Sequence, residues 1–261
     1  MDAAIYVAII SGCVALASAA ISLYGVAFQE QQKKQLIALQ HKLEQESKKQ
    51  TKEQLVKELI GKYREPLLTA AFDLQSRIYN IVEINFLDNY YINGTKLEKE
   101  YASDNTLYVI AEYFGWVEII RREIQFLNLI EVIENRKFLQ LINQINQRFL
   151  EGRIDRTFRI FRGEQRAIGE IMMTPLSANN NSPSRECIGY ATFVLKQKDP
   201  DFSCWFEKLR QDIEVLANEP GKHSQRLIKL QHALVELIDF LDPECIRFAK
   251  EFRTKINRES C

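Results

Sequence analysis

The sequence predicts an all-α protein with three parts: an N-terminal transmembrane helix, a helical stalk and a multi-helix bundle. Three observations support this prediction. The 25 residues from Ala4 to Phe28 contain no charged side chain. Glycine and proline are scarce, at 10 and 6 of 261 residues, which favours long helices over a turn-rich β fold. Apolar residues in the rest of the chain recur at helical spacing over several long segments.

Residues 1–28 are predicted to be a membrane anchor. A helix of 25 uncharged residues is roughly 37 Å long, enough to cross a hydrocarbon core of about 30 Å. The alternative is a cleaved signal peptide, because Ala15-Leu16-Ala17-Ser18-Ala19 resembles a small-residue cleavage site. However, no lysine or arginine precedes the apolar run, and the run continues beyond this site. An uncleaved anchor in the lipid bilayer is therefore expected.

Positive charge flanks the anchor on one side only. Asp2 precedes it, and five lysines follow it at positions Lys33, Lys34, Lys42, Lys48 and Lys49. Because positively charged flanks stay in the cytoplasm, we expect the N-terminus outside and the C-terminal domain in the cytoplasm. The expected location is a plasma membrane, of the bacterial inner-membrane type.

Small residues form two rows at helical spacing inside the anchor, Ala4, Ala8 and Gly12 in one and Ser11, Ala15 and Ala19 in the other. Such rows allow two transmembrane helices to approach closely. They predict a helix-packing face and a possible homo-oligomer. The alternative is that an alanine-rich anchor contains such rows by chance.

Residues 29–62 are predicted to form a helical stalk, because Gln, Lys, Glu and Leu favour helix. Leu36, Leu39 and Leu43 have coiled-coil spacing, but the pattern then fails and resumes only at Leu55. A sustained coiled coil needs three or four unbroken heptads. The stalk is therefore expected to be solvated, with weak coiled-coil character.

Residues 63–261 are predicted to form a cytoplasmic helical domain. Pro66 is expected to open its first helix, which continues to Asn85, because proline is tolerated in a first helical turn. A polar stretch over 88–105 precedes a second helix, capped by Ser103 or Asp104 and continuing to about Glu131. This second helix is apolar nearly all round, which predicts a central position in the bundle.

The later elements are also expected to be helical. The run Cys187–Lys196 is assigned to helix, because a strand there has no evident partner strand. Residues 174–186 contain two prolines and three asparagines and are predicted to be a mobile loop. The remaining predicted helices are Val132–Leu150, Asp155–Met173, Asp201–Asn218, Ser224–Leu241 and Pro243–Lys255.

Common catalytic and metal-binding motifs are absent from the sequence. It contains no nucleotide-binding glycine motif, no GxSxG and no ExxH. Its three histidines and five cysteines form no HxxxH or CxxC pair, so no metal and no cofactor are expected. The balance of 35 basic and 35 acidic residues gives no broad positive field, which argues against nucleic acid as a partner. Enzymatic activity is disfavoured without being excluded.

One segment carries arginines at an unusual spacing, with steps of three, three, three and four between Arg153 and Arg166. Steps of three drift around a helix, so only Arg159, Arg162 and Arg166 are candidates to converge on one ligand. Guanidinium groups so placed suit phosphate or carboxylate. The alternative is structural pairing with neighbouring carboxylates such as Asp155, Glu164 and Glu170.

Carboxylates on the second helix allow two interpretations. Buried Glu112, Glu118 and Glu123 would have shifted pKa values, which are common at functional sites. The alternative is ion pairing, for which Glu118 and Arg122 have favourable i, i+4 spacing.

These observations leave three functions open. The leading hypothesis is a membrane-anchored binding or scaffold module with a protein partner, since the chain has an anchor and a stalk but no catalytic set. The second is a sensor or enzyme that binds a phosphorylated ligand at Arg159, Arg162 and Arg166. The third is a membrane effector that oligomerises through its anchor.

Overall fold

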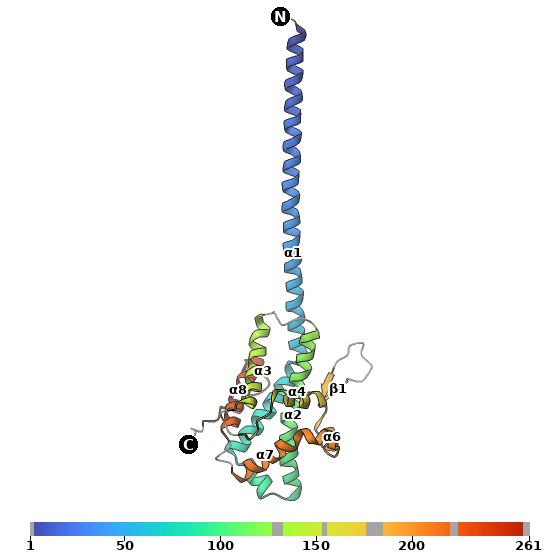
Figure 1. Cartoon of the computed structure of the whole chain (residues 1–261). Coiled ribbons are helices and arrows are strands. Elements are labelled where there is room, and N and C mark those ends of the chain that lie inside the picture. The colour runs from blue at the N-terminus through green and yellow to red at the C-terminus, as the bar shows by residue number, and fades with distance from the viewer. Residues whose placement is uncertain (1–2, 127–132, 153–155, 176–184, 220–223, 258–261) are drawn as a thin grey trace. The chain divides into compact units, whose positions relative to one another are not determined.

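The computed structural model describes residues 3–126, 133–152, 156–175, 185–219 and 224–257. The chain divides into two units, Met1–Leu55 and Val56–Cys261. Within the described ranges both units are helical, apart from one two-stranded sheet in the second unit (Figure 1). The predicted all-α class is therefore confirmed.

Helix α1 (Ala3–Glu83) is the one element described in the first unit. The predicted stalk is accordingly helical. Apolar side chains here are open to solvent, with 60% of Val14 and 74% of Leu16 accessible. A search of the described residues finds no helix long and apolar enough to cross a membrane. The transmembrane assignment of residues 1–28 therefore stays a prediction.

In the second unit α1 passes through Pro66, so the prediction that Pro66 opens a helix is wrong. A proline inside a helix costs about 3 kcal/mol. Fully burying one large apolar side chain stabilises by about 1.5–3 kcal/mol. Several of them on this face of α1 outweigh the proline, namely Leu67, Leu68, Leu74 and Ile78.

Helix α2 (Lys96–Phe126) begins earlier than predicted, because Thr95 and Glu98 cap its N-terminus. The Glu98 carboxylate accepts hydrogen bonds from the backbone N–H and the hydroxyl of Thr95, both at 2.7 Å. The π-helix η1 (Asp88–Ile92) occupies the start of the predicted polar stretch. The central position of α2 is confirmed, since both of its faces contain buried residues such as Leu107, Tyr113, Phe114 and Ile119.

Helix α3 (Ile133–Leu150) agrees with its prediction, whereas the helix predicted over 155–173 is shorter. Phe158 has a positive φ of 54°, and helix α4 (Arg162–Ile171) begins only after this turn. Gly169 allows α4 to pack directly on α2. A Cβ at this position would lie 2.6 Å from the backbone oxygen of Phe114.

A short antiparallel sheet replaces part of a predicted helix. Strand β1 (Met173–Pro175) pairs with β2 (Arg185–Cys187), with Met173 opposite Cys187 and Pro175 opposite Arg185. Helix α5 (Tyr190–Lys196) starts after this pairing, so the helix assignment at Cys187 is wrong. Most of the predicted loop, residues 176–184, lies outside the described residues.

Four helical elements follow: α6 (Pro200–Ser203), η2 (Cys204–Phe206), α7 (Glu207–Asn218) and α8 (Gln225–Leu241). The predicted helix over 224–241 is confirmed, and the one over 201–218 is divided among the first three elements. Helix α8 packs against α3. Buried side chains of both helices, such as Ile145 and Leu234, belong to the hydrophobic core.

The helix predicted to start at Pro243 is wrong. Over the described residues 243–257 the structure has one short 3-10 helix, η3 (Lys250–Arg253). Asp242 explains the difference. Its carboxylate accepts backbone N–H bonds from Ile246, Arg247 and Phe248 at 3.0–3.2 Å and pairs with buried Arg253. Burial alone would raise the pKa of Asp242. The three backbone N–H groups and the charge of Arg253 outweigh the effect of burial, so the pKa of Asp242 is lowered. The bonds stabilise a turn in place of the helix.

Arg226 of α8 holds the end of α3. Its guanidinium is fully buried and donates to the backbone oxygens of Thr157 (2.9 Å), Arg148 (2.8 Å) and Glu151 (2.8 Å). Carbonyl groups at the C-terminus of a helix lack intrahelical partners and carry partial negative charge. A buried cation therefore satisfies this end of α3 and fixes the segment leading to α4.

Candidate functional site

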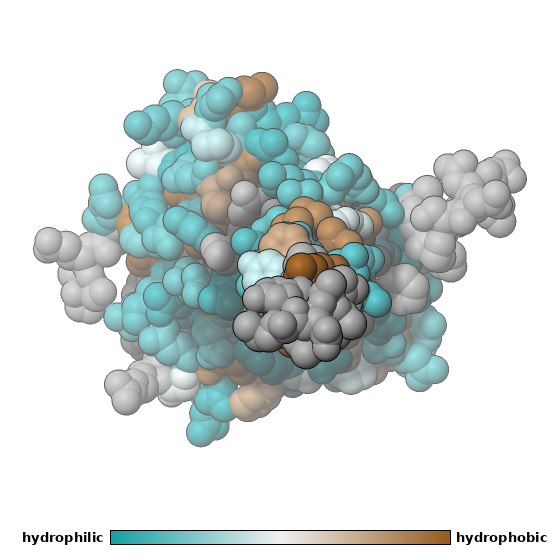
Figure 2. Space-filling model, turned by 90° about the horizontal axis from the view of Figure 1, so that it is seen from above, coloured by the Kyte–Doolittle hydropathy of each residue, from teal (hydrophilic) through white to brown (hydrophobic). Residues whose placement is uncertain are grey.

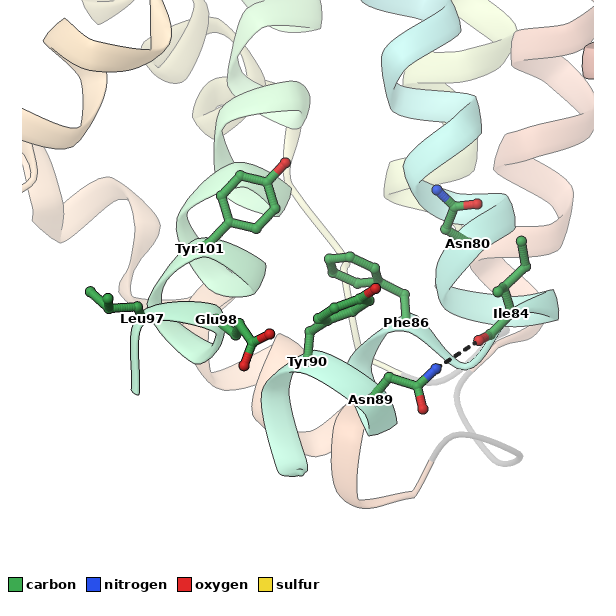
Figure 3. A pocket seen from close by; sticks show the side chains of 8 residues that line it. All are labelled: Asn80, Ile84, Phe86, Asn89, Tyr90, Leu97, Glu98 and Tyr101. Atoms are coloured by element: carbon green, nitrogen blue, oxygen red, sulfur yellow. Dashed lines mark hydrogen bonds between the residues drawn. The ribbon is translucent and has the colours of Figure 1, made fainter. Parts of the chain in front are cut away.

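An open pocket lies where the end of α1, the π-helix η1 and the start of α2 meet (Figure 3). Its volume is about 620 Å³, and ligand sites in proteins commonly span about 300–1,000 Å³. The residues that line it are mainly aromatic and aliphatic: Asn80, Ile84, Phe86, Asn89, Tyr90, Leu97, Glu98 and Tyr101.

The backbone at the end of α1 shapes one wall of this pocket. Asn85 adopts the left-handed conformation, with φ of 55°, and turns the chain away from α1. The Asn89 side-chain amide donates to the Ile84 backbone oxygen at 3.3 Å, the dashed line in Figure 3. The π-helix η1 then presents Tyr90. Such π-helical turns occur frequently at functional sites.

Large apolar side chains around the pocket are open to solvent. The accessible fraction is 77% for Leu97, 56% for Ile84 and 43% for Tyr90. Tyr101, which also lines the pocket, is exposed as well. On the face that Figure 2 shows, much of the described surface is hydrophilic. Grouped exposed apolar residues mark interaction surfaces.

Aromatic rings and one arginine form the inner side of the site. The rings of Phe86 and Tyr90 are 5.0 Å apart. The Arg77 guanidinium lies 4.0 Å from the Phe86 ring centre and 5.8 Å from that of Tyr101, and it donates to Asn105. Burial lowers the pKa of Arg77. These contacts keep Phe86 and Tyr101 in place.

A row of tyrosines leads from the pocket to a half-buried carboxyl group. The ring of Tyr190 is 6.3 Å from that of Tyr101 and 5.3 Å from that of Tyr108. Burial raises the pKa of Glu112, the hydrogen bond from Tyr108 opposes this, and the charge of Asp73 adds to it. Glu112 is thus held where its charged form is disfavoured.

Replacing Glu112 by glutamine is expected to stabilise the protein at neutral pH. Because the folded state raises the pKa of Glu112, stability is lost as pH increases from the ordinary glutamate pKa of about 4.3 to the raised value. Glutamine keeps an oxygen for Tyr108 and does not ionise, so this loss disappears. Urea unfolding at pH 4 and pH 7 measures it, with exposed Glu100→Gln as the control. An equal effect of Glu112→Gln at both pH values contradicts the assignment.

The arginines predicted to bind a ligand lie outside this pocket. Arg159 precedes α4 and is half-buried, with its guanidinium 4.5 Å from the Phe161 ring centre. Arg162 and Arg166 are exposed one turn apart on α4. Within the described ranges no ion pair involves any of these three. The ligand site at Arg159, Arg162 and Arg166 stays a prediction.

The carboxylates proposed as structural partners of those arginines have other contacts. Glu164 accepts from the backbone N–H of Phe161 at 2.6 Å, and Glu170 pairs with Arg122 at 2.9 Å. Asp155 lies outside the described residues. Arg122 also contacts buried Glu118 at 2.8 Å, which confirms the predicted i, i+4 pair.

Two further predictions concern metal binding and the anchor. Among the described residues no group of three His, Cys, Asp or Glu side chains could hold a metal ion. In the predicted anchor-packing face, Ser11 and Gly12 are exposed. The side chains of Ala4, Ala8, Ala15 and Ala19 lie outside the described part of the chain.

The sequence interpretation missed the pocket because its aromatic residues come from a stretch that was classified mainly by its polar residues. Tyr90 and Tyr101 are spaced among asparagines and charged residues, a setting in which single aromatic residues carry no periodic signal. Comparisons with protein-family models, curated proteins and solved structures find no match.

Proposed function

We propose that this chain is a single-pass, membrane-anchored binding module that holds a protein partner at the pocket between α1 and α2. The observation that carries the proposal is the exposed apolar surface around the pocket, where Leu97 is 77% and Ile84 is 56% accessible. Covering one such side chain contributes about 1.5–3 kcal/mol. A few apolar or aromatic anchors dominate most protein interfaces.

The proposed anchor is residues 1–28, with the C-terminal domain on the cytoplasmic side of a plasma membrane. Its support is the uncharged run of 25 residues and the lysines that follow it. The open apolar side chains of Ile10, Val14, Leu16 and Phe28 are consistent with a lipid surrounding.

Two arginines in the anchor are expected to release the protein from membranes. The variant is Val14→Arg with Leu16→Arg, and a charge near the bilayer centre costs about 2.5–3.5 kcal/mol on insertion scales. The measurement is the fraction of full-length protein that stays in the membrane pellet after an alkaline carbonate wash. Leu36→Arg with Leu39→Arg, in the stalk, is the matched control and should stay in the pellet. Release of the unaltered protein by the wash would contradict the proposal that residues 1–28 are a membrane anchor.

A ligand sensor or enzyme at the arginine segment is the second candidate. Arg162 and Arg166 are exposed, and within the described ranges neither makes an ion pair, so both guanidinium groups are open to an anion. Saturable binding of a nucleotide that disappears in Arg162→Gln would favour this function over the partner module. The exposed row Leu36, Leu39 and Leu43 on α1 also leaves self-association of the module open.

A further inference from the structure

Three aromatic rings and one carboxylate line the same pocket. Phe86, Tyr90 and Tyr101 supply the rings, and in Figure 3 the Glu98 carboxylate points toward Tyr90. The face of an aromatic ring is negative and attracts a cation within about 6 Å of its centre. A carboxylate beside such rings adds a full opposite charge. This is the lining expected of a site for a cationic group.

The Glu98 carboxylate is charged and has one oxygen available. Its Oε2 accepts both hydrogen bonds from Thr95, and these bonds lower the pKa of Glu98. Across the residues that the structure describes, Oε1 has no donor. The helix cap therefore places an ionised carboxylate at the pocket without using all of its acceptor capacity.

The charges around the pocket also favour a cation. Residues 83–100 contain the four carboxylates Glu83, Asp88, Glu98 and Glu100 but only the lysines Lys96 and Lys99. Lys96 pairs with Glu100 at 3.9 Å and Lys99 lies 4.5 Å from the Tyr91 ring centre, so the segment keeps two more acidic than basic side chains. The excess of negative charge is complementary to a basic partner.

Arg77 is the cation closest to the rings, and it restricts where a second one fits. It stacks on Phe86 at 4.0 Å and is held by Asn105, while the acidic Asp73 lies within its field. A bound cation is therefore expected at the Glu98 side of the pocket, against Tyr90 and Tyr101.

The apolar rim indicates that the cation is part of a peptide chain. Ile84 and Leu97 are exposed by 56% and 77%, and a small ammonium compound would leave them uncovered. A lysine or arginine stem packs on aromatic and aliphatic surface while its charged end reaches a carboxylate. Apolar residues beside it in the same segment would cover the rim.

We propose that the pocket accepts a lysine or arginine side chain of the partner protein, with flanking apolar residues packed on Ile84 and Leu97. The charged end pairs with Glu98 beside the rings of Tyr90 and Tyr101. This inference rests on the proposed function and specifies the chemistry of the partner.

The test compares matched peptides on the full-length protein in nanodiscs of zwitterionic lipid. A panel of fluorescent peptides carries one lysine between leucines and alanines, each made with lysine and with N-acetyl-lysine, and empty nanodiscs give the background. Lysine peptides are expected to bind roughly tenfold more tightly than acetylated ones, a difference typical of one desolvated cation contact. In Glu98→Gln this preference should fall to about twofold or less. Glutamine retains an oxygen for the Thr95 cap, so the fold is kept.

Three outcomes overturn the inference. The first is equal binding of lysine and acetyl-lysine peptides throughout the panel, and the second is no binding of either. The third is a lysine preference that persists in both Glu98→Gln and Tyr101→Leu. Equal binding of both peptides that disappears in Leu97→Asn would contradict the basic side chain but not the proposed partner site.

Discussion

Replacing Arg226 by methionine is expected to lower the free energy of unfolding by about 3–5 kcal/mol. The guanidinium is fully buried and donates to the backbone oxygens of Arg148, Glu151 and Thr157 at 2.8–2.9 Å. Methionine fills the space of the stem but removes the buried donor that these carbonyl groups share, and losing the partner of a buried polar group costs about 1–3 kcal/mol. The losses at the three carbonyl groups do not add fully, so the expected change in the free energy of unfolding is smaller than three separate losses would give.

The measurement is urea unfolding of full-length protein in detergent, followed by circular dichroism. Arg247→Met is the matched control, since the Arg247 side chain is exposed and its ion pair within the described ranges is a 3.5 Å surface contact with Glu65. The backbone N–H that Arg247 donates to Asp242 is kept in this variant. Exposed pairs are worth about 0–1 kcal/mol. Equal, small effects of both substitutions would show that Arg226 does not hold the end of α3.

Leu97→Asn is expected to weaken partner binding about 100-fold, the second large effect. Leu97 is 77% exposed at the rim of the pocket, so asparagine is tolerated by the fold. In the complex the variant would lose an apolar contact of about 1.5–3 kcal/mol and bury an unpaired amide that costs about 1–3 kcal/mol, without adding a charge that a basic partner could pair with. Co-purification from native membranes measures the loss. Leu195→Asn, at a residue that is 65% exposed away from the pocket, is the control and should retain the partner.

Helical periodicity allowed the long elements to be predicted. Helices α3 and α8 begin and end close to their predicted bounds, and α2 is central, because apolar spacing reports directly on burial. Pro66 and Thr95 are the two positions where a local helix-start signal led to a wrong helix boundary. Proline is a helix-start signal only when the tertiary burial around it is modest, and the Thr95–Glu98 capping box was present in the sequence but not recognised.

Contacts between distant residues determine the remaining parts of the fold. Strand β2 needed β1 as its partner, and a three-residue strand has no periodic signal. The turn after α8 depends on Asp242 and Arg253, which meet only in the folded chain. The pocket likewise requires the left-handed Asn85 to bring Phe86 and Tyr90 beside α2. These features depend on contacts between residues that are distant in the sequence, so no linear motif predicts them.

Position-specific photo-crosslinking in native membranes tests the central claim most directly. A photoreactive residue replaces Leu97 at the pocket in one full-length variant and exposed Lys198 in another. The binding-module account predicts one reproducible protein adduct from position 97, which is absent from position 198 and disappears when Tyr90→Ala is added. Adducts from position 97 that are no more abundant than those from position 198, or that persist with Tyr90→Ala, would contradict it.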